Sequence, residues 1–177
     1  MAENVIKVSN FSSILVRVFY GKVFVNITVR GLESLHNRFA EDMIGGAAAV
    51  LLVDALSSFS ELMVAAATPV VANMAALARV AAAFAVPVVL STREGQGPAC
   101  DQVAGAVPRY HAFERSGTAV LADQPTLCAI QRLRRRVLFL AAWGRSRDIM
   151  DVALEAQRAG FDVRVVLDAC WVSDDPD

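Results

Sequence analysis

The sequence predicts an α/β protein in which helices cover both faces of a mainly parallel β-sheet. Short, continuously apolar runs alternate along the chain with stretches whose apolar residues recur at helical spacing. Strands that are apolar on both sides are typical of parallel sheets buried between helices. The composition agrees with this prediction, because 55% of the 177 residues are hydrophobic and only 20% are charged, which is enough apolar material for a sizeable core.

The N-terminal part of the chain differs from the rest. Residues 14–31 alternate apolar and polar side chains, and Gly21 lies between the two halves, a pattern typical of a β-hairpin. We therefore expect an N-terminal extension over residues 1–45, with a hairpin, and a main domain over residues 46–177. The hairpin could serve as an accessory edge of the sheet, as an oligomer contact or as a poorly packed extension.

Four apolar runs predict the central strands. They are AAAVLLVDA (47–55), AVPVVLST (85–92), VLFLAAW (137–143) and FDVRVVLDA (161–169). Parallel strands joined by helices imply right-handed crossovers. The segment WVSDDPD comes soon after the fourth run, with only Cys170 between them, so we expect a closing helix that is short or missing.

Two helices are predicted between these strands by apolar residues that share one side. In residues 71–84 these residues are Met74, Leu77, Val80, Ala81 and Phe84. In residues 148–160 they are Ile149, Val152, Ala153 and Ala156. Gly160 is the expected stop of the second helix. A further helical stretch surrounds Cys128, ahead of the third predicted strand.

The charge balance argues against nucleic-acid and membrane partners. Seventeen Lys and Arg against 18 Asp and Glu give a formal net charge of −1, so no basic field attracts nucleic acid or anionic lipid. The basic run 132–136 directly precedes an apolar strand, which favours a solvated helix end or a gatekeeper over a nucleic-acid patch. The N-terminus lacks a secretory pattern, and prolines and charges interrupt residues 62–90. The sequence therefore predicts a soluble, cytoplasmic protein.

No cofactor or metal is implied by the residues. The three cysteines, Cys100, Cys128 and Cys170, are odd in number and lack paired spacing, which argues against a disulfide framework or a zinc site. His36 and His111 form no metal-ligand spacing with an acid. The loop STREGQGP contains glycines but no G-x-G-x-x-G, so a nucleotide-binding, flavodoxin-like domain is a poor third reading.

Polar residues follow each of the predicted strands. Asp54 follows the first, the STREGQGP loop the second, GRSRD the third and Asp168 the fourth. Ligands of parallel α/β sheets bind beyond the carboxyl ends of the strands. We therefore expect a ligand site at this edge of the sheet. Trp143 and Trp171 stand beside strand ends and could line a pocket, although core or interface packing is the simpler role.

Three segments in this order resemble the isochorismatase-like hydrolases, also called the cysteine hydrolase superfamily, and in particular their YcaC-like branch. The segments are LLVDALSSF, NMAALARVAAAFAVPVVLSTREGQGP and VLFLAAWGRSRDIMDVALEAQRAGFDVRVVLDA, and the resemblance covers residues 47–169. It implies a three-layer α/β/α fold, a small-molecule substrate or ligand, and assembly into a homo-oligomer.

The resemblance also implies site residues. The family's usual machinery is an aspartate after the first strand, a lysine or arginine after the third, and a cysteine that opens the helix after the fourth and attacks an amide or related carbonyl. Backbone N–H groups at that helix start, near a cis peptide bond, hold the oxyanion. These positions fall on Asp54, Arg115 and Asp148, where AAWGRSRD stands in place of a pattern of the type AGxxTxxC. The thiol is therefore absent from the expected catalytic position.

Each of the three residues has a simpler explanation. Asp54 could cap the next helix, and Arg115, on a predicted loop, could be solvated. Asp148 could be an ordinary N-cap or first-turn acid, and its carboxylate would then repel an anionic intermediate at that helix start. Two acids in one pocket also need a counter-charge from Arg115 or Arg145.

Two functions remain open. The first is a hydrolase of a small molecule, acting on an amide or related C–N or C–O bond through acid–base chemistry in a degenerate site. Isochorismatases lack the thiol too, but the residue in its place is small there, so isochorismate is not favoured as the substrate. The second function is that of a non-catalytic family member that binds a ligand or forms oligomers.

Overall fold

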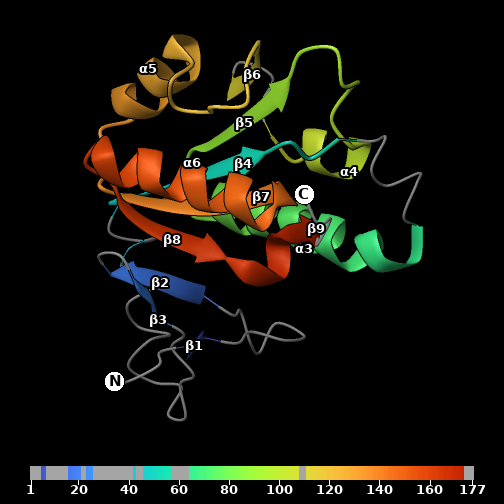
Figure 1. Cartoon of the computed structure of the whole chain (residues 1–177), viewed down its shortest axis with the longest axis horizontal. Coiled ribbons are helices and arrows are strands. Elements are labelled where there is room, and N and C mark those ends of the chain that lie inside the picture. The colour runs from blue at the N-terminus through green and yellow to red at the C-terminus, as the bar shows by residue number, and fades with distance from the viewer. Residues whose placement is uncertain are drawn as a thin grey trace.

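Five parallel strands form the centre of the structure, a computed structural model that describes residues 5–6, 16–20, 23–25, 42, 46–56, 64–107 and 111–173 (Figure 1). Their order across the sheet is β8-β7-β4-β5-β6. The strands are β4 (Ala48–Val53), β5 (Val88–Arg93), β6 (Ala112–Arg115), β7 (Val137–Arg145) and β8 (Asp162–Val166). Each of the four predicted apolar runs coincides with one of them, although β5 and β7 extend one and two residues beyond their runs. The prediction of a mainly parallel sheet is confirmed.

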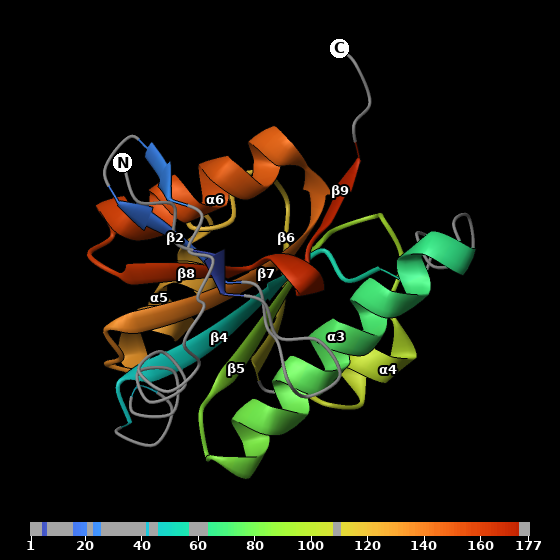
Figure 2. The ribbon, with the colours of Figure 1, turned by 90° about the horizontal axis from the view of Figure 1, so that it is seen from below.

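Helices cover both faces of this sheet. Figure 2 shows α3 and α6 on opposite sides of the strands. The first face carries α3 (Val64–Ala83) and α4 (Asp101–Ala104), and the second carries α5 (Gln124–Arg132) and α6 (Ser146–Arg158). The result is the three-layer α/β/α arrangement that the family resemblance implies.

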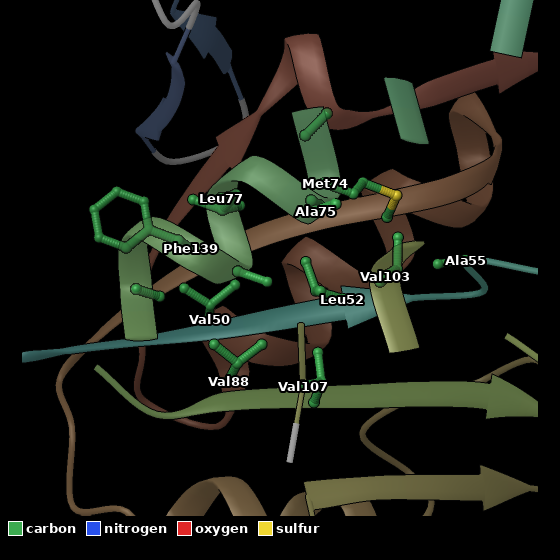
Figure 3. Packing of buried hydrophobic residues seen from close by; sticks show 14 of the residues in the cluster. Val50, Leu52, Ala55, Met74, Ala75, Leu77, Val88, Val103, Val107 and Phe139 are labelled. Atoms are coloured by element: carbon green, nitrogen blue, oxygen red, sulfur yellow. The ribbon is translucent and has the colours of Figure 1, made fainter. Parts of the chain in front are cut away.

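Strand alternation divides the core between the two faces. Along β4, Val50 and Leu52 join the cluster under α3, where Met74 packs against them (Figure 3). Leu51 and Val53 point the other way and pack under α6, whose predicted stripe is buried in full. All six residues of β4 are at most 3% exposed, and this burial on both sides explains why the strand is apolar throughout.

The structure differs from the predicted helix 71–84 at both ends. The helix α3 begins earlier, at Val64, and contains Pro69. It ends at Ala83, so Phe84 does not complete the apolar side and is 48% exposed. The chain turns there, because Ala85 adopts a left-handed φ of 55° and the Val86 N–H bonds back to the Ala81 carbonyl. None of the described helices is long and apolar enough to pass through a lipid bilayer.

The strand β6 was not predicted from the sequence. It has only four residues, and just one of them, Arg115, is buried. A strand of four residues whose buried side chain is an arginine contains no apolar run, so the sequence pattern does not reveal it. Arg115 therefore lies at the end of a strand and not on the solvated loop that the sequence suggested.

The N-terminal hairpin extends the sheet beyond β8. Strands β2 (Val16–Tyr20) and β3 (Val23–Val25) pair antiparallel, as the alternation predicts, and β1 (Val5–Ile6) pairs with β2. β2 also pairs antiparallel with β8. Of the three roles considered for the hairpin, the structure shows that of an accessory edge.

After β8 the chain forms the short 3-10 helix η2 (Leu167–Ala169) and then β9 (Trp171–Ser173), which pairs parallel with the second half of β7. The described residues that follow β8 thus form no α-helix, as expected, and residues 174–177 lie outside the described part. Trp143 of β7 and Trp171 of β9 are register partners, and their rings stack with centroids 5.5 Å apart. This packing accounts for both tryptophans.

We predict that Gly160→Ala destabilises the protein through its backbone alone. Gly160 follows α6 with a φ of 92°, and a Cβ built there meets no atom within 4 Å. The loss should be about 1 kcal/mol of unfolding free energy, because an L side chain strains the left-handed region. Urea denaturation followed by circular dichroism measures it. Gly160→Asn should lose less, since asparagine tolerates this region, and equal stability of all three proteins would contradict the prediction.

Candidate functional site

The ends of three neighbouring strands meet at a buried cluster of charged side chains. Asp54 follows β4, Arg93 ends β5 and Arg115 ends β6. Because β4 pairs with β5 and β5 with β6, all in parallel, these ends lie at one edge of the sheet. This is the edge at which ligands bind in α/β sheets of this type.

Asp54 and Arg115 form the centre of the cluster. Nη2 of Arg115 donates a hydrogen bond to Oδ2 of Asp54 at 2.5 Å, and the two side chains are 1% and 7% exposed. Nη1 of Arg115 donates to Oγ of Ser91 at 3.3 Å. Arg115 thus crosses the end of β5 to reach the strand beyond it. A charge-assisted hydrogen bond of this kind is strong, and burial makes the loss of either partner costly.

Arg93 is a second guanidinium at the same carboxylate, and sequence reasoning missed it. Its Nη2 lies 3.6 Å from Oδ2 of Asp54, and its side chain is 28% exposed. The sequence places the STREGQGP loop at the expected ligand edge but singles out no residue within it. The signal for Arg93 is a charged residue that directly follows a buried strand segment, because a charge in such a place needs a partner.

The backbone of Asp54 is held in an unusual conformation. Its φ is 52°, in the left-handed region that aspartate tolerates better than most residues. The Asp54 N–H donates to the Ser91 carbonyl at 2.9 Å, and the Leu56 N–H donates to the Asp54 carbonyl at 2.8 Å. Helix α3 begins ten residues further on, at Val64, so Asp54 does not cap it, and its carboxylate serves the two arginines instead.

One oxygen of Asp54 remains available. Both guanidiniums approach Oδ2, whereas Oδ1 is buried and accepts no hydrogen bond from the described residues. A buried acceptor without a donor is unfavourable by about 1–3 kcal/mol. Such an atom is a natural contact point for a polar ligand.

Asp148 lies at the same edge of the sheet, in the first turn of α6. Strand β7 pairs with β4 so that Ala142 is the register partner of Val53, the residue before Asp54. Asp148 folds back over the end of β7, because a Cβ built on Gly144 would lie 3.5 Å from its Oδ2. The structure therefore joins Asp54 and Arg115 directly and places Asp148, half-buried, beside the end of the next strand. All described peptide bonds are trans, which differs from the cis peptide implied near this helix start.

None of the three cysteines lies in α6, the helix at whose start the family resemblance implies a nucleophile. Cys100 and Cys170 are buried in the two core clusters, and Cys128 lies in α5. Burial, together with the nearby charge of Asp168, raises the pKa of the Cys170 thiol to about 12. This thiol stays protonated at neutral pH and is a poor nucleophile. Cys100 is near Asp54 only through its backbone, since its N–H donates to the Ala55 carbonyl at 2.7 Å.

The described residues include no group of three His, Cys, Asp or Glu side chains arranged to hold a metal ion. His36, one of the two histidines considered in the sequence, lies outside the described residues. The chemistry that the cluster itself offers is that of a carboxylate and two guanidiniums, which can hold a polar or charged small molecule and exchange protons with it.

Comparison with solved structures gives clear matches. YcaC from Escherichia coli, described as an octameric hydrolase of unknown specificity, is 26% identical to the chain with a TM-score of 0.65. A YcaC from Pseudomonas aeruginosa, with hexane-2,5-diol and covalent acrylamide, gives the same values. Each similarity covers 72% of this chain and 65% of the YcaC chain, so the chain spans just under two thirds of their length.

An isochorismatase from Pseudomonas putida has a TM-score of 0.65 at 17% identity, over 75% of this chain and 74% of the other, and at that identity it shows the fold alone. No family model and no curated protein matches the sequence. The fold and its neighbours define a class, the three-layer α/β/α proteins with a parallel sheet. The similarity to the two YcaC structures supports the isochorismatase-like superfamily that the sequence suggested.

We predict strong energetic coupling between Asp54 and Arg115. Asp54→Asn should lower the free energy of unfolding by roughly 3 kcal/mol, because it leaves a buried guanidinium without its counter-charge. Asparagine suits the left-handed φ, so the variant tests the charge and not the backbone. Combined with Arg115→Met, the loss should fall short of the sum of the single losses by about 1–3 kcal/mol.

Chemical denaturation of the two single variants and the double variant measures this coupling. Asp162→Asn is the matched control, since Asp162 is 51% exposed and its ion pair with Arg164 is 3.7 Å long. The control should change stability by less than about 0.5 kcal/mol. Strictly additive losses for Asp54 and Arg115 would show that their contact contributes nothing to stability.

Proposed function

We propose that this chain is an isochorismatase-like hydrolase of a small molecule, with an active site that has lost its thiol and is formed by Asp54, Arg115 and Asp148. The observation that carries the proposal is the buried contact of Asp54 with Arg115 at the carboxyl edge of the sheet. These two positions match the family's aspartate and basic residue. Asp148 matches the position of the missing cysteine, at the start of the helix that follows β7.

The loss of the thiol changes the chemistry. A carboxylate at the start of α6 interacts with the N–H groups that would otherwise stabilise an oxyanion, and its charge repels one. We therefore propose direct attack of water on an amide or a related C–N or C–O bond. Asp54, opposed by two guanidiniums, accepts the proton of the attacking water through Oδ1. As the C–N or C–O bond breaks, the protonated form of Asp148 gives its proton to the leaving group and then regains one from solvent.

A non-catalytic role is the second candidate, and the residues of the site favour it. The carboxylate of Asp54 is already paired with two arginines, and Asp148 stands where the family has its nucleophile. In this role the site binds a ligand without converting it. In either role we propose residues 46–177 as the hydrolase domain, residues 1–45 as an extension, a cytoplasmic location, and assembly into a homo-oligomer. The octamer described for the Escherichia coli YcaC supports the last point.

We predict that Asp148→Cys restores a reactive thiol. The Pseudomonas aeruginosa YcaC carries covalent acrylamide, so acrylamide is the probe, and intact-protein mass spectrometry measures its addition across a pH series. A thiol in the first turn of a helix keeps its thiolate form, and hence its reactivity, at lower pH. Asp151→Cys, one turn further along α6 and exposed, is the matched control whose reaction should fall about tenfold per pH unit below pH 8.

The wild-type protein supplies the background of Cys100, Cys128 and Cys170 in this experiment. Its buried thiols should react slowly, and labelling of Cys100 or Cys170 that abolishes ligand binding would overturn the site assignment. Equal pH dependence of the two introduced thiols would show that position 148 is not the family's nucleophile position.

We predict further that Asp148→Asn separates the two candidate functions. The wild-type protein, Asp148→Asn and the control Asp151→Asn are compared on a panel of small amides and esters, with turnover and binding measured for each. If the protein is a hydrolase, turnover should fall by roughly 100-fold or more in Asp148→Asn, as expected for loss of a general acid, and should stay unchanged in Asp151→Asn. Binding without turnover that changes only in Asp148→Asn supports the non-catalytic role. Three proteins with identical turnover and binding would contradict both.

A further inference from the structure

Two arginines face each other at the end of the β5–β6 pair. Arg93 and Arg115 are register partners in this parallel pair, so their side chains leave the sheet on the same face. Like charges placed directly opposite on neighbouring strands repel each other. The arrangement requires compensating negative charge, and Asp54 supplies one carboxylate, whose Oδ2 both arginines approach.

The three side chains in contact carry unequal charges. Two guanidiniums share one carboxylate, in a place where Arg115 is 1% and Asp54 7% exposed. Glu114 adds no charge here, because strand alternation sends its side chain to the other face, and it is exposed. Asp148 adds a carboxylate at the end of β7, on the other side of β4 from β5. Of the two guanidiniums, that of Arg93 is held more weakly by Asp54, at 3.6 Å against 2.5 Å, and is the one that an anion can approach.

The donors of Arg93 are the ones that a ligand can reach. Arg115 uses Nη2 on Asp54 and Nη1 on Ser91, and its Nε, which has no partner among the described residues, belongs to a side chain that is only 1% exposed. Arg93 approaches Asp54 only at 3.6 Å, which is too long for a hydrogen bond, and its Nε is buried without a hydrogen-bond partner among the described residues. With 28% of its side chain exposed, Arg93 is also the member of the cluster that solvent reaches.

The end of β5 holds Arg93 in place. The Glu94 N–H donates to the Arg115 carbonyl at 2.9 Å and the Gln96 N–H to the Arg93 carbonyl at 3.3 Å. The chain then turns away through Gly95 and Gly97, both with positive φ and with open space at their Cα atoms. A guanidinium anchored on a strand end beside an open glycine turn can be approached by a small molecule.

We propose that Arg93 binds the carboxylate of a small ligand. A carboxylate matches the planar guanidinium, because it accepts two parallel hydrogen bonds from it. The ligand's remaining atoms then lie toward Oδ1 of Asp54. The inference rests on the proposed function, because it names the substrate or ligand class of that same site and adds a specificity-determining residue to it.

The test compares carboxylates with their neutral amides. Acetate, propionate and benzoate are titrated against acetamide, propionamide and benzamide by isothermal calorimetry, with chloride holding the ionic strength constant. We expect wild-type protein to bind at least one carboxylate and to bind its amide at least about tenfold more weakly, as loss of a charge-assisted contact implies. Arg93→Gln should weaken carboxylate binding by a similar factor, and Arg93→Lys by less.

Arg79→Gln is the matched control, because Arg79 is exposed on α3, on the other face of the sheet, and its replacement should leave binding unchanged. Circular dichroism and thermal melting verify that each variant is folded. The inference is overturned if no carboxylate binds, if amides bind equally well, or if Arg93→Gln binds as wild type does. Inorganic phosphate bound more tightly than every carboxylate would overturn the choice of ligand class.

The outcome is separable from that of the proposed function. Loss of carboxylate binding in Arg93→Gln, with Asp148→Asn unchanged in turnover and binding, keeps this inference and rejects the proposed site. Loss of turnover in Asp148→Asn, with unaltered carboxylate binding in Arg93→Gln, supports the proposed site and rejects the role of Arg93.

Discussion

The buried guanidinium of Arg115 is the constraint on which the site depends. A charge that is 1% exposed is tolerable only if a carboxylate meets it, and here that carboxylate comes from a strand two places away in the sheet. The contact therefore requires the order β4-β5-β6, the register that brings Arg93 beside Arg115, and the left-handed turn at Asp54. The electrostatics of the site and the geometry of the sheet are coupled, because this strand order and register bring the three charged side chains together.

Much of the fold could be predicted from the sequence, because burial on both faces makes strands apolar throughout. β4 is apolar throughout for this reason, and β5, β7 and β8 were recognised by the apolar runs that make up most of each strand. The stripe on α6 and its stop at Gly160 follow from helical periodicity. β6 escaped prediction because its buried residue is an arginine and its length is four residues. A strand whose inward side chain is charged cannot be recognised by hydrophobicity and becomes evident only when its partner is known.

The site was predictable to a smaller extent. The carboxyl-edge rule selected Asp54 and the turn after β7 correctly as places on one edge, whereas Arg115 was located through family resemblance and Arg93 was missed. The reason is physical. Which face a side chain leaves, and which neighbour it meets, depends on register between strands distant in sequence, and register is not encoded in any short segment.

The attachment of the hairpin to β8 affects how the protein reaches its native state. Val16 pairs with Val166, so residues about 150 positions apart are neighbours in the sheet. During synthesis on the ribosome the hairpin emerges long before the strand it must join. Closing so large a loop is entropically slow, and topologies with many such distant contacts fold slowly. Until β8 appears, the edge of β2 that it will join is unpaired and open to self-association.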